Sequence, residues 1–172
     1  MITVFKRIGA ARLIPLAILS ASVGALGFAY TAEMAFGYEP CKLCLYQRIP
    51  FAVTGILALV ALSGPMEGVR GSRTQTIVIA LCGLVYLVGG AIAIYHVGVE
   101  QHWWASAVCG GISPSSLTFE KMQQSLMQGE PKACDTFDWQ LFGNSMAGYN
   151  IVYSILLAIG CFASTKLLRK AP

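Results

Sequence analysis

Four long apolar stretches constrain this chain more than any other feature of its sequence. They cover approximately residues 13–32, 46–64, 76–99 and 145–165. About 20 consecutive apolar residues make a helix long enough to cross the roughly 30 Å of hydrocarbon in a bilayer. Only 12% of the residues are charged, against roughly 25% in ordinary soluble domains. The sequence therefore predicts an all-α membrane protein, a four-transmembrane-helix bundle in which residues 1–172 form a single membrane domain.

The first apolar stretch follows a basic start and precedes small residues, as the core of a signal peptide would. Its apolar core is longer than the roughly 7 to 15 residues of a signal sequence. We therefore expect this stretch to be retained as the first span.

Lysine and arginine residues indicate the side of the membrane on which each connection lies. Because cytoplasmic segments carry an excess of these residues, we expect both termini in the cytoplasm and the loops of approximately residues 33–45 and 100–144 outside. The net charge of +4 is then a signal of topology and requires no nucleic acid partner. The basic residues precede the first span, separate the second from the third, and follow the fourth: Lys6, Arg7, Arg12, Arg70, Arg73, Lys166, Arg169 and Lys170.

The long external loop contains a segment with helical periodicity, residues 113–129. It begins with a Ser-Pro-Ser start signal and ends at a glycine. Its apolar residues recur at helical spacing, namely Phe119, Met122, Leu126 and Met127. The pattern predicts a short amphipathic helix, lying either on the membrane surface or against the rest of the loop.

The cysteines fall into two groups by this topology. Cys82 and Cys161 lie in the middle of spans, where a free cysteine behaves as a small hydrophobic residue. The external loops contain the others: Cys41, Cys44, Cys109 and Cys134. An even number of thiols outside the cytosol indicates disulfides. A disulfide between the last two could be purely structural or could exchange with another protein's thiolate, and the residues leave both interpretations open.

The first pair lies at the edge of an apolar run, in the segment YEPCKLCLYQRIPF. If Pro40 begins the second helix, Cys41 and Cys44 occupy its first turn at i and i+3, within disulfide range. The partial positive charge of a helix N-terminus favours a thiolate. We therefore predict that these cysteines are reactive.

Arg48 lies further along the same helix. At about 100° per residue it shares a face with the two cysteines, with Gln47 at the margin. Its guanidinium would stabilise an anion beside Cys44, either the thiolate or a reduced acceptor. The alternative is an arginine that snorkels to the interface without a redox role.

Reactive thiols need an electron acceptor. We find no G-x-G-x-x-G motif after a strand and no soluble nucleotide-binding region, so a thiol pair at the lipid edge points to a lipid-soluble acceptor, a quinone. Haem attachment is excluded because Leu45 follows Cys44. A zinc ribbon is disfavoured because the second cysteine pair lacks the short C-x-x-C spacing, and we predict no metal site.

The motif Pro40-Cys41-x-Leu43-Cys44-x-x-Gln47-Arg48 resembles the signature of the bacterial disulfide bond formation protein B family (DsbB). The likeness continues through YHVGVEQHWW, the loop cysteines and CDTFDWQLFGNSMAGYN, and so covers nearly the whole chain. The resemblance implies a protein-dithiol:quinone oxidoreductase of the bacterial inner membrane, with periplasmic redox loops, that sustains disulfide bond formation during protein folding. Its partner would be a periplasmic thioredoxin-like dithiol oxidase of the DsbA type, and its cofactor ubiquinone or menaquinone.

The resemblance also implies a role for each loop cysteine. Cys109 would form the mixed disulfide with the partner, and Cys134 would be its disulfide mate in the resting enzyme. Cys41 would exchange with Cys134, and Cys44 would face the quinone.

The implied quinone site consists of Cys44, Arg48 beside a quinone oxygen, Gln47, and His96 close to the ring. By itself, a histidine at the end of a span is typical of an interface residue. One departure from the family is the turn before Cys109, where Ser106-Ala107-Val108 replaces a Gly-Pro turn. This difference bears on the fit of the partner and leaves the chemistry intact.

Two other functions are compatible with the pattern. A four-span membrane scaffold with purely structural loop disulfides would keep Cys41 and Cys44 oxidised when quinone is depleted. A thiol redox protein similar to vitamin K epoxide reductase would have its C-x-x-C near the fourth span, whereas the motif here begins the second.

Overall fold

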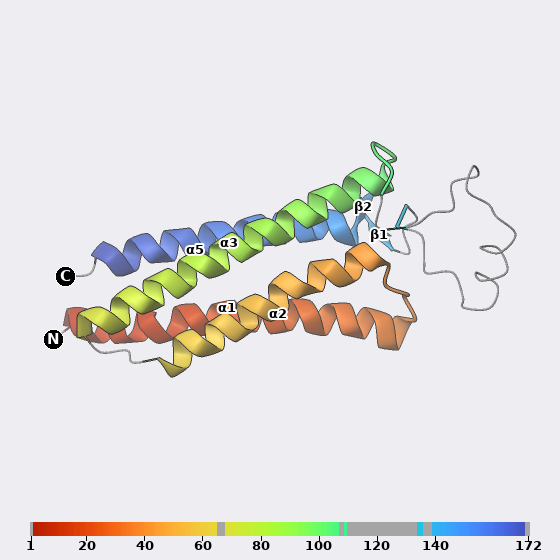
Figure 1. Ribbon diagram of the computed structural model, residues 1–172. Coiled ribbons are helices and arrows are strands. Elements are labelled where there is room, and N and C mark those ends of the chain that lie inside the picture. The colour runs from red at the N-terminus through yellow and green to blue at the C-terminus, as the bar shows by residue number, and fades with distance from the viewer. Residues whose placement is uncertain (1, 65–67, 107–108, 110–133, 136–138, 171–172) are drawn as a thin grey trace, which may run out of the picture.

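The computed structural model describes residues 2–64, 68–106, 109, 134–135 and 139–170, with only the backbone of 2–11, 68–72 and 169–170. Four long helices lie side by side, and both ends of the chain lie at one end of the bundle (Figure 1). They are α1 (Ile2–Phe36), α2 (Lys42–Ser63), α3 (Gly68–Glu100) and α5 (Met146–Lys170).

Each helix contains a segment long and apolar enough to cross a membrane. These segments are Arg12–Phe36, Lys42–Ser63, Arg73–Glu100 and Met146–Leu168. The predicted four-helix membrane bundle is therefore confirmed. The predicted amphipathic helix, residues 113–129, lies outside the described residues.

Helix α3 packs along α5 and against α2, whereas α1 packs mainly on α2 and touches α5 sparsely. Small residues bring α3 close to its neighbours, since a side chain at Gly89 would meet Pro50 and one at Gly83 would meet Phe162. Such close approach supplies much of helix packing in lipid. Apolar side chains fill the centre: Ile18, Phe51, Ala58, Ile79 and Ala158.

A buried polar cluster joins three of the helices. The Ser22 hydroxyl lies 2.8 Å from Thr54 Oγ1 and 2.8 Å from Tyr86 Oη, and all three residues are fully buried. Thr54 also donates to the Pro50 carbonyl at 2.9 Å. Because hydrocarbon offers no hydrogen bonds, polar groups at this depth must satisfy one another. The cluster therefore fixes how α1, α2 and α3 are rotated relative to one another.

A short hairpin precedes α5 at the end of the bundle away from the termini (Figure 1). Strand β1 (Gln140–Leu141) pairs with β2 (Asn144–Ser145) in antiparallel register. Phe142 and Gly143 connect them with φ values of 51° and 78°, as a type I′ turn requires. This turn places Ser145 directly at the start of α5.

Candidate functional site

Helix α2 begins at Lys42, with Cys41 as its N-cap. The expectation that Pro40 begins this helix is therefore wrong. The reason is that Cys41 Sγ accepts the Cys44 backbone N–H at 3.2 Å, a bond usually made by a serine or aspartate oxygen at this position. The two cysteines still lie together, with Sγ atoms 2.8 Å apart.

The surroundings of Cys41 favour its anionic form. The hydrogen bond with the Cys44 side chain has the largest effect, and hydrogen bonds from His96 and the Cys44 backbone add to it. Together they outweigh the cost of burial and lower the pKa of Cys41 to about 4. A reduced Cys41 is then a thiolate at neutral pH, which is the nucleophilic form of cysteine.

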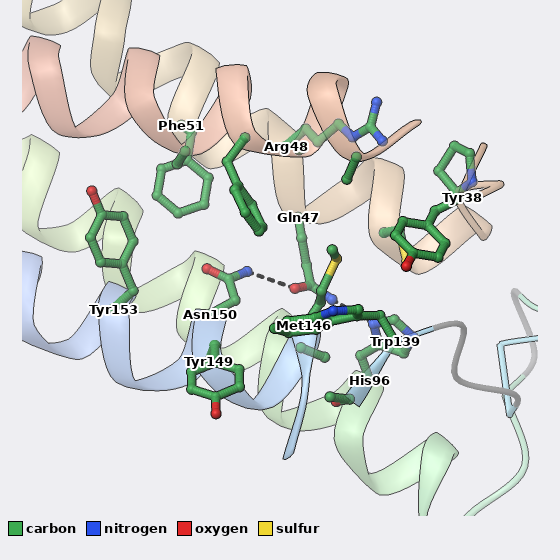
Figure 2. A pocket seen from close by; sticks show the side chains of 18 of the residues that line it. Tyr38, Gln47, Arg48, Phe51, His96, Trp139, Met146, Tyr149, Asn150 and Tyr153 are labelled. Atoms are coloured by element: carbon green, nitrogen blue, oxygen red, sulfur yellow. Dashed lines mark hydrogen bonds between the residues drawn. The ribbon is translucent and has the colours of Figure 1, made fainter. Parts of the chain in front are cut away.

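His96, on α3, faces both the cysteine pair and the amide of Gln47. Its Nε2 lies 3.5 Å from Cys41 Sγ, and its Nδ1 lies 2.6 Å from Gln47 Nε2. Asn150 of α5 donates from Nδ2 to Gln47 Oε1 at 2.6 Å (Figure 2). The structure therefore brings together Gln47 and His96, and it adds Asn150, which the sequence analysis missed.

Arg48 points the other way, toward α1. Its Nη1 donates to Glu33 Oε2 at 2.7 Å, and its guanidinium carbon lies 4.7 Å from the centre of the Tyr30 ring. The charge of Arg48 is thus held at the wall formed by α1. Glu33 and Tyr30 were not among the predicted site residues.

The second cysteine pair forms a disulfide, Cys109–Cys134, with Cα atoms 5.7 Å apart. It lies in the same buried cluster as Cys41, together with Leu43 and Val99. The two pairs are far apart in sequence, yet the fold brings them together at one end of the bundle.

A cavity of about 670 Å³ opens where α1 and α5 make few contacts. Apolar side chains of α1, α2 and α5 form most of its wall, among them Phe28, Phe51, Val152 and Leu156. Its polar end is lined by Cys41, Cys44, Gln47, Arg48, His96 and Glu100. Figure 2 shows three of them, Gln47, Arg48 and His96. Small-molecule sites typically enclose about 300 to 1,000 Å³ with a few polar groups on an apolar wall, and this cavity has both properties.

Glu100, the last residue of α3, is a further buried polar group of the site that the sequence analysis did not select. Its Oε2 accepts the Ser145 hydroxyl at 2.5 Å, and its Oε1 lies 3.6 Å from His96 Nε2. The spacing of four residues from His96 was a usable signal, because residues at i and i+4 share a helix face. No comparable signal connects Arg48 to Glu33 or Gln47 to Asn150.

The ligand atoms of Cys41, Cys44 and His96 lie within 4.8 Å of one another, which raises the question of a metal centre. Two thiolates bound to one tetrahedral zinc ion at about 2.3 Å lie roughly 3.7 Å apart. The observed separation of 2.8 Å between the sulfur atoms is shorter, and it fits a dithiol poised to form a disulfide better than a pair of metal ligands.

Comparisons with known proteins identify similar chains. The family described as "Disulfide bond formation protein DsbB" matches residues 11–164. A "Disulfide bond formation protein B" of Aromatoleum aromaticum is 32% identical over 90% of this chain and 91% of that protein. Proteins of the same name from Xylella fastidiosa (strain Temecula1) and Xanthomonas campestris (strain 8004) are also 32% identical, covering 87% and 81% of both chains, respectively. No solved structure shows a significant match.

Proposed function

Because this chain belongs to the DsbB family of disulfide bond formation proteins, we propose that it is an inner-membrane protein-dithiol:quinone oxidoreductase. Its partner is a periplasmic thioredoxin-like dithiol oxidase of the DsbA type. Electrons pass from the partner's dithiol to Cys109–Cys134, then to Cys41–Cys44, and finally to ubiquinone or menaquinone. The cysteine ends of the helices face the periplasm and both termini face the cytoplasm.

One observation carries this proposal: the reactive cysteine pair lines an apolar cavity within the membrane-spanning part of the bundle. A quinone has a flat polar ring and a long apolar tail. The cavity offers a polar end at Cys44, Arg48 and His96 and an apolar remainder between α1 and α5. The residues present therefore suit this cofactor.

Three side chains would hold the ring. Arg48 offers a cation to a ring oxygen that gains negative charge, and Gln47 and His96 form the opposite side of the polar end (Figure 2). Cys44, which lines the cavity together with Cys41, would deliver the electrons. A bound quinone supplies the two-electron acceptor that the protein's own side chains lack.

The steps before the quinone are thiol-disulfide exchanges, each of which breaks one S–S bond and forms another. Cys109 is 9% exposed and Cys134 only 2%, which supports Cys109 as the residue that the partner's thiolate attacks. Cys134 is then released and attacks Cys41, with which it shares a buried cluster. That attack breaks the Cys41–Cys44 bond, and Cys44 leaves. Once the partner's second thiol has released Cys109, Cys109 attacks Cys134 and restores their disulfide; Cys41 then leaves as a thiolate, and its low pKa makes it a good leaving group.

The test is reduction of a short-chain quinone by the purified protein, supplied with a reduced thioredoxin-like donor and followed by the loss of quinone absorbance. Cys44→Ala should abolish turnover. The matched control, Cys161→Ala, removes a buried cysteine of α5 and should leave quinone turnover unchanged. Turnover of Cys44→Ala at the parental rate would contradict the mechanism and would favour a scaffold with structural disulfides.

A further inference from the structure

Glu100 is a buried carboxylate with its own supporting contacts. It is 6% exposed, and carboxylates are almost never so buried unless they are paired. The Ser145 hydroxyl donates to its Oε2 at 2.5 Å, while Ser145 Oγ accepts the Gly148 N–H at 3.3 Å. The β1–β2 hairpin fixes Ser145 in this position. The carboxylate is therefore held in one orientation, with Oε1 toward His96.

A single nitrogen of His96 faces two acceptors. Nε2 lies 3.5 Å from Cys41 Sγ and 3.6 Å from Glu100 Oε1. The other nitrogen, Nδ1, lies against the Gln47 amide nitrogen, which can only donate. Nδ1 must then accept, so the proton of a neutral ring lies on Nε2.

A chain of amides maintains this tautomer. Asn150 Nδ2 donates to Gln47 Oε1 at 2.6 Å, and the Ser154 hydroxyl donates to Asn150 Oδ1 at 3.1 Å. Because Gln47 Oε1 accepts from Asn150, the Gln47 NH2 is the end that faces His96. The Nε2–H of His96 is consequently directed toward the space between Cys41 and Glu100.

We propose that Glu100 is a positioning residue that accepts the His96 Nε2–H while Cys41 is in a disulfide and yields it when Cys41 becomes a thiolate. A disulfide sulfur carries no charge and accepts poorly, so the N–H then lies toward the carboxylate. When exchange breaks the bond at Cys41, the sulfur keeps the bonding electron pair, and the N–H turns to it. No proton is gained or lost, because the same N–H serves both acceptors. The inference rests on the proposed function only in that Cys41 alternates between these two states.

The charged and titratable groups around His96 come from every side. Cys41 and Cys44 face it from the start of α2, and Glu100 lies on α3 itself. The groups from β2 and α5 are the neutral Ser145 and Asn150. In the same cavity, α1 contributes Glu33, which is paired with Arg48, and the segment before α2 contributes the exposed Glu39.

This arrangement allows a test by whether the effect of Glu100 depends on His96. As a simple charge, the Glu100 carboxylate opposes a neighbouring thiolate, so its removal would lower the pKa of Cys41 to the same extent with or without the imidazole. As a positioning residue, it also competes with the thiolate for the His96 Nε2–H, so its removal would lower that pKa more when His96 is present than when it is absent.

The measurement uses the full-length reduced protein in nanodiscs without quinone or partner. Ultraviolet absorbance of the thiolate and the rate of Cys41 alkylation by iodoacetamide, mapped by mass spectrometry, are followed against pH. For Glu100→Gln we expect the Cys41 midpoint to fall by about one pH unit or more, and to fall by clearly less when the same change is made in a His96→Phe background. An unchanged or higher midpoint, or an equal fall in the two backgrounds, would overturn the proposal.

Two further variants complete the test. Ser145→Ala removes the hydrogen bond that holds the carboxylate toward Nε2, and it should lower the midpoint by a smaller amount, again with a larger effect when His96 is present. If Glu100→Gln does not fold, this variant decides. Glu39→Gln removes an exposed carboxylate two residues from Cys41 and should give the same small change or none, with and without His96. Because neither quinone nor partner is present, failure here is separate from failure of the oxidoreductase proposal.

Discussion

Arg48 and Glu33 form an ion pair between α2 and α1, with Nη1 2.7 Å from Oε2. The Arg48 side chain is 14% exposed and that of Glu33 36%, so the pair lies partly out of water at the cavity wall. The Tyr30 ring covers the guanidinium at 4.7 Å. An anion that forms beside Cys44 must therefore compete with Glu33 for this cation.

Glu33→Gln removes that competition. We expect the apparent KM for quinone to fall about two- to fivefold, since partly exposed ion pairs contribute roughly 0.2 to 1 kcal/mol. Steady-state quinone reduction at a saturating concentration of reduced donor measures this. Glu39→Gln, which removes another acidic group of the cavity rim, is the matched control. A higher KM in Glu33→Gln would mean that Glu33 orients Arg48 for the quinone.

Arg48→Met removes the cation and retains an unbranched apolar side chain. We expect the KM for quinone to rise about tenfold, equivalent to roughly 1.4 kcal/mol, because the reduced ring oxygen loses its counter-charge. Reduction of Cys109–Cys134 by the donor, followed by stopped-flow, should keep its rate. Lys42→Met, which removes an exposed cation at the start of α2, should change neither quantity. An unaltered KM in Arg48→Met would remove Arg48 from the site.

The low pKa of Cys41 predicts how its reactivity depends on pH. Because the pKa is lowered to about 4, from roughly 8.5 in free cysteine, the reduced protein carries a thiolate at every pH above that value. The rate of Cys41 alkylation, corrected for the pH dependence of the reagent itself, should stay constant from neutral pH downward and fall only near pH 4. The same shift stabilises the reduced fold above about pH 8.5, a contribution that is lost as the pH falls through the folded value. A midpoint near that of free cysteine would contradict this environment.

Tyr86→Phe tests the buried polar cluster. The change removes the hydroxyl that lies 2.8 Å from Ser22 Oγ and leaves the ring in place. We expect the free energy of unfolding to fall by about 0.6 to 1.5 kcal/mol, measured by SDS titration in mixed micelles. Tyr153→Phe removes an exposed hydroxyl bonded to the Ala21 carbonyl and should cost less. If both variants lose the same free energy of unfolding, the buried cluster stabilises the protein no more than the exposed hydroxyl of Tyr153 does.

Gly98→Ala tests the turn that leads from α3 to Cys109. A side chain at Gly98 would overlap the Trp104 ring, which stacks on Tyr95 with ring centres 5.8 Å apart. Displacing Trp104 should slow the reduction of Cys109–Cys134 by the donor about tenfold while the KM for quinone is retained. Gly27→Ala, where the added carbon meets no atom within 4 Å, is the matched control. Equal rates in the two variants would show that this turn does not position Cys109.

The sequence predicted the architecture well because hydropathy and charge act along the chain. A run of about 20 apolar residues must cross the bilayer as a helix, whichever helix it contacts. This rule was enough to predict the spans and to assign the four loop cysteines to one end of the bundle. The start of α2 was placed two residues early because N-cap chemistry, with a cysteine in the role of a serine, is a local hydrogen-bond property that composition does not report.

The partners of the site residues depended on tertiary structure. The sequence by itself determined that Cys41, Cys44 and Arg48 lie at the start of one membrane helix. Only the rotation and crossing of the helices decided that Arg48 meets Glu33, that Gln47 lies between His96 and Asn150, and that Ser145 holds Glu100. These partners are separated by up to 103 positions, and they are set by the packing of small residues and by the need to satisfy polar groups in a medium without water. Neither constraint has a period that can be read along a single chain.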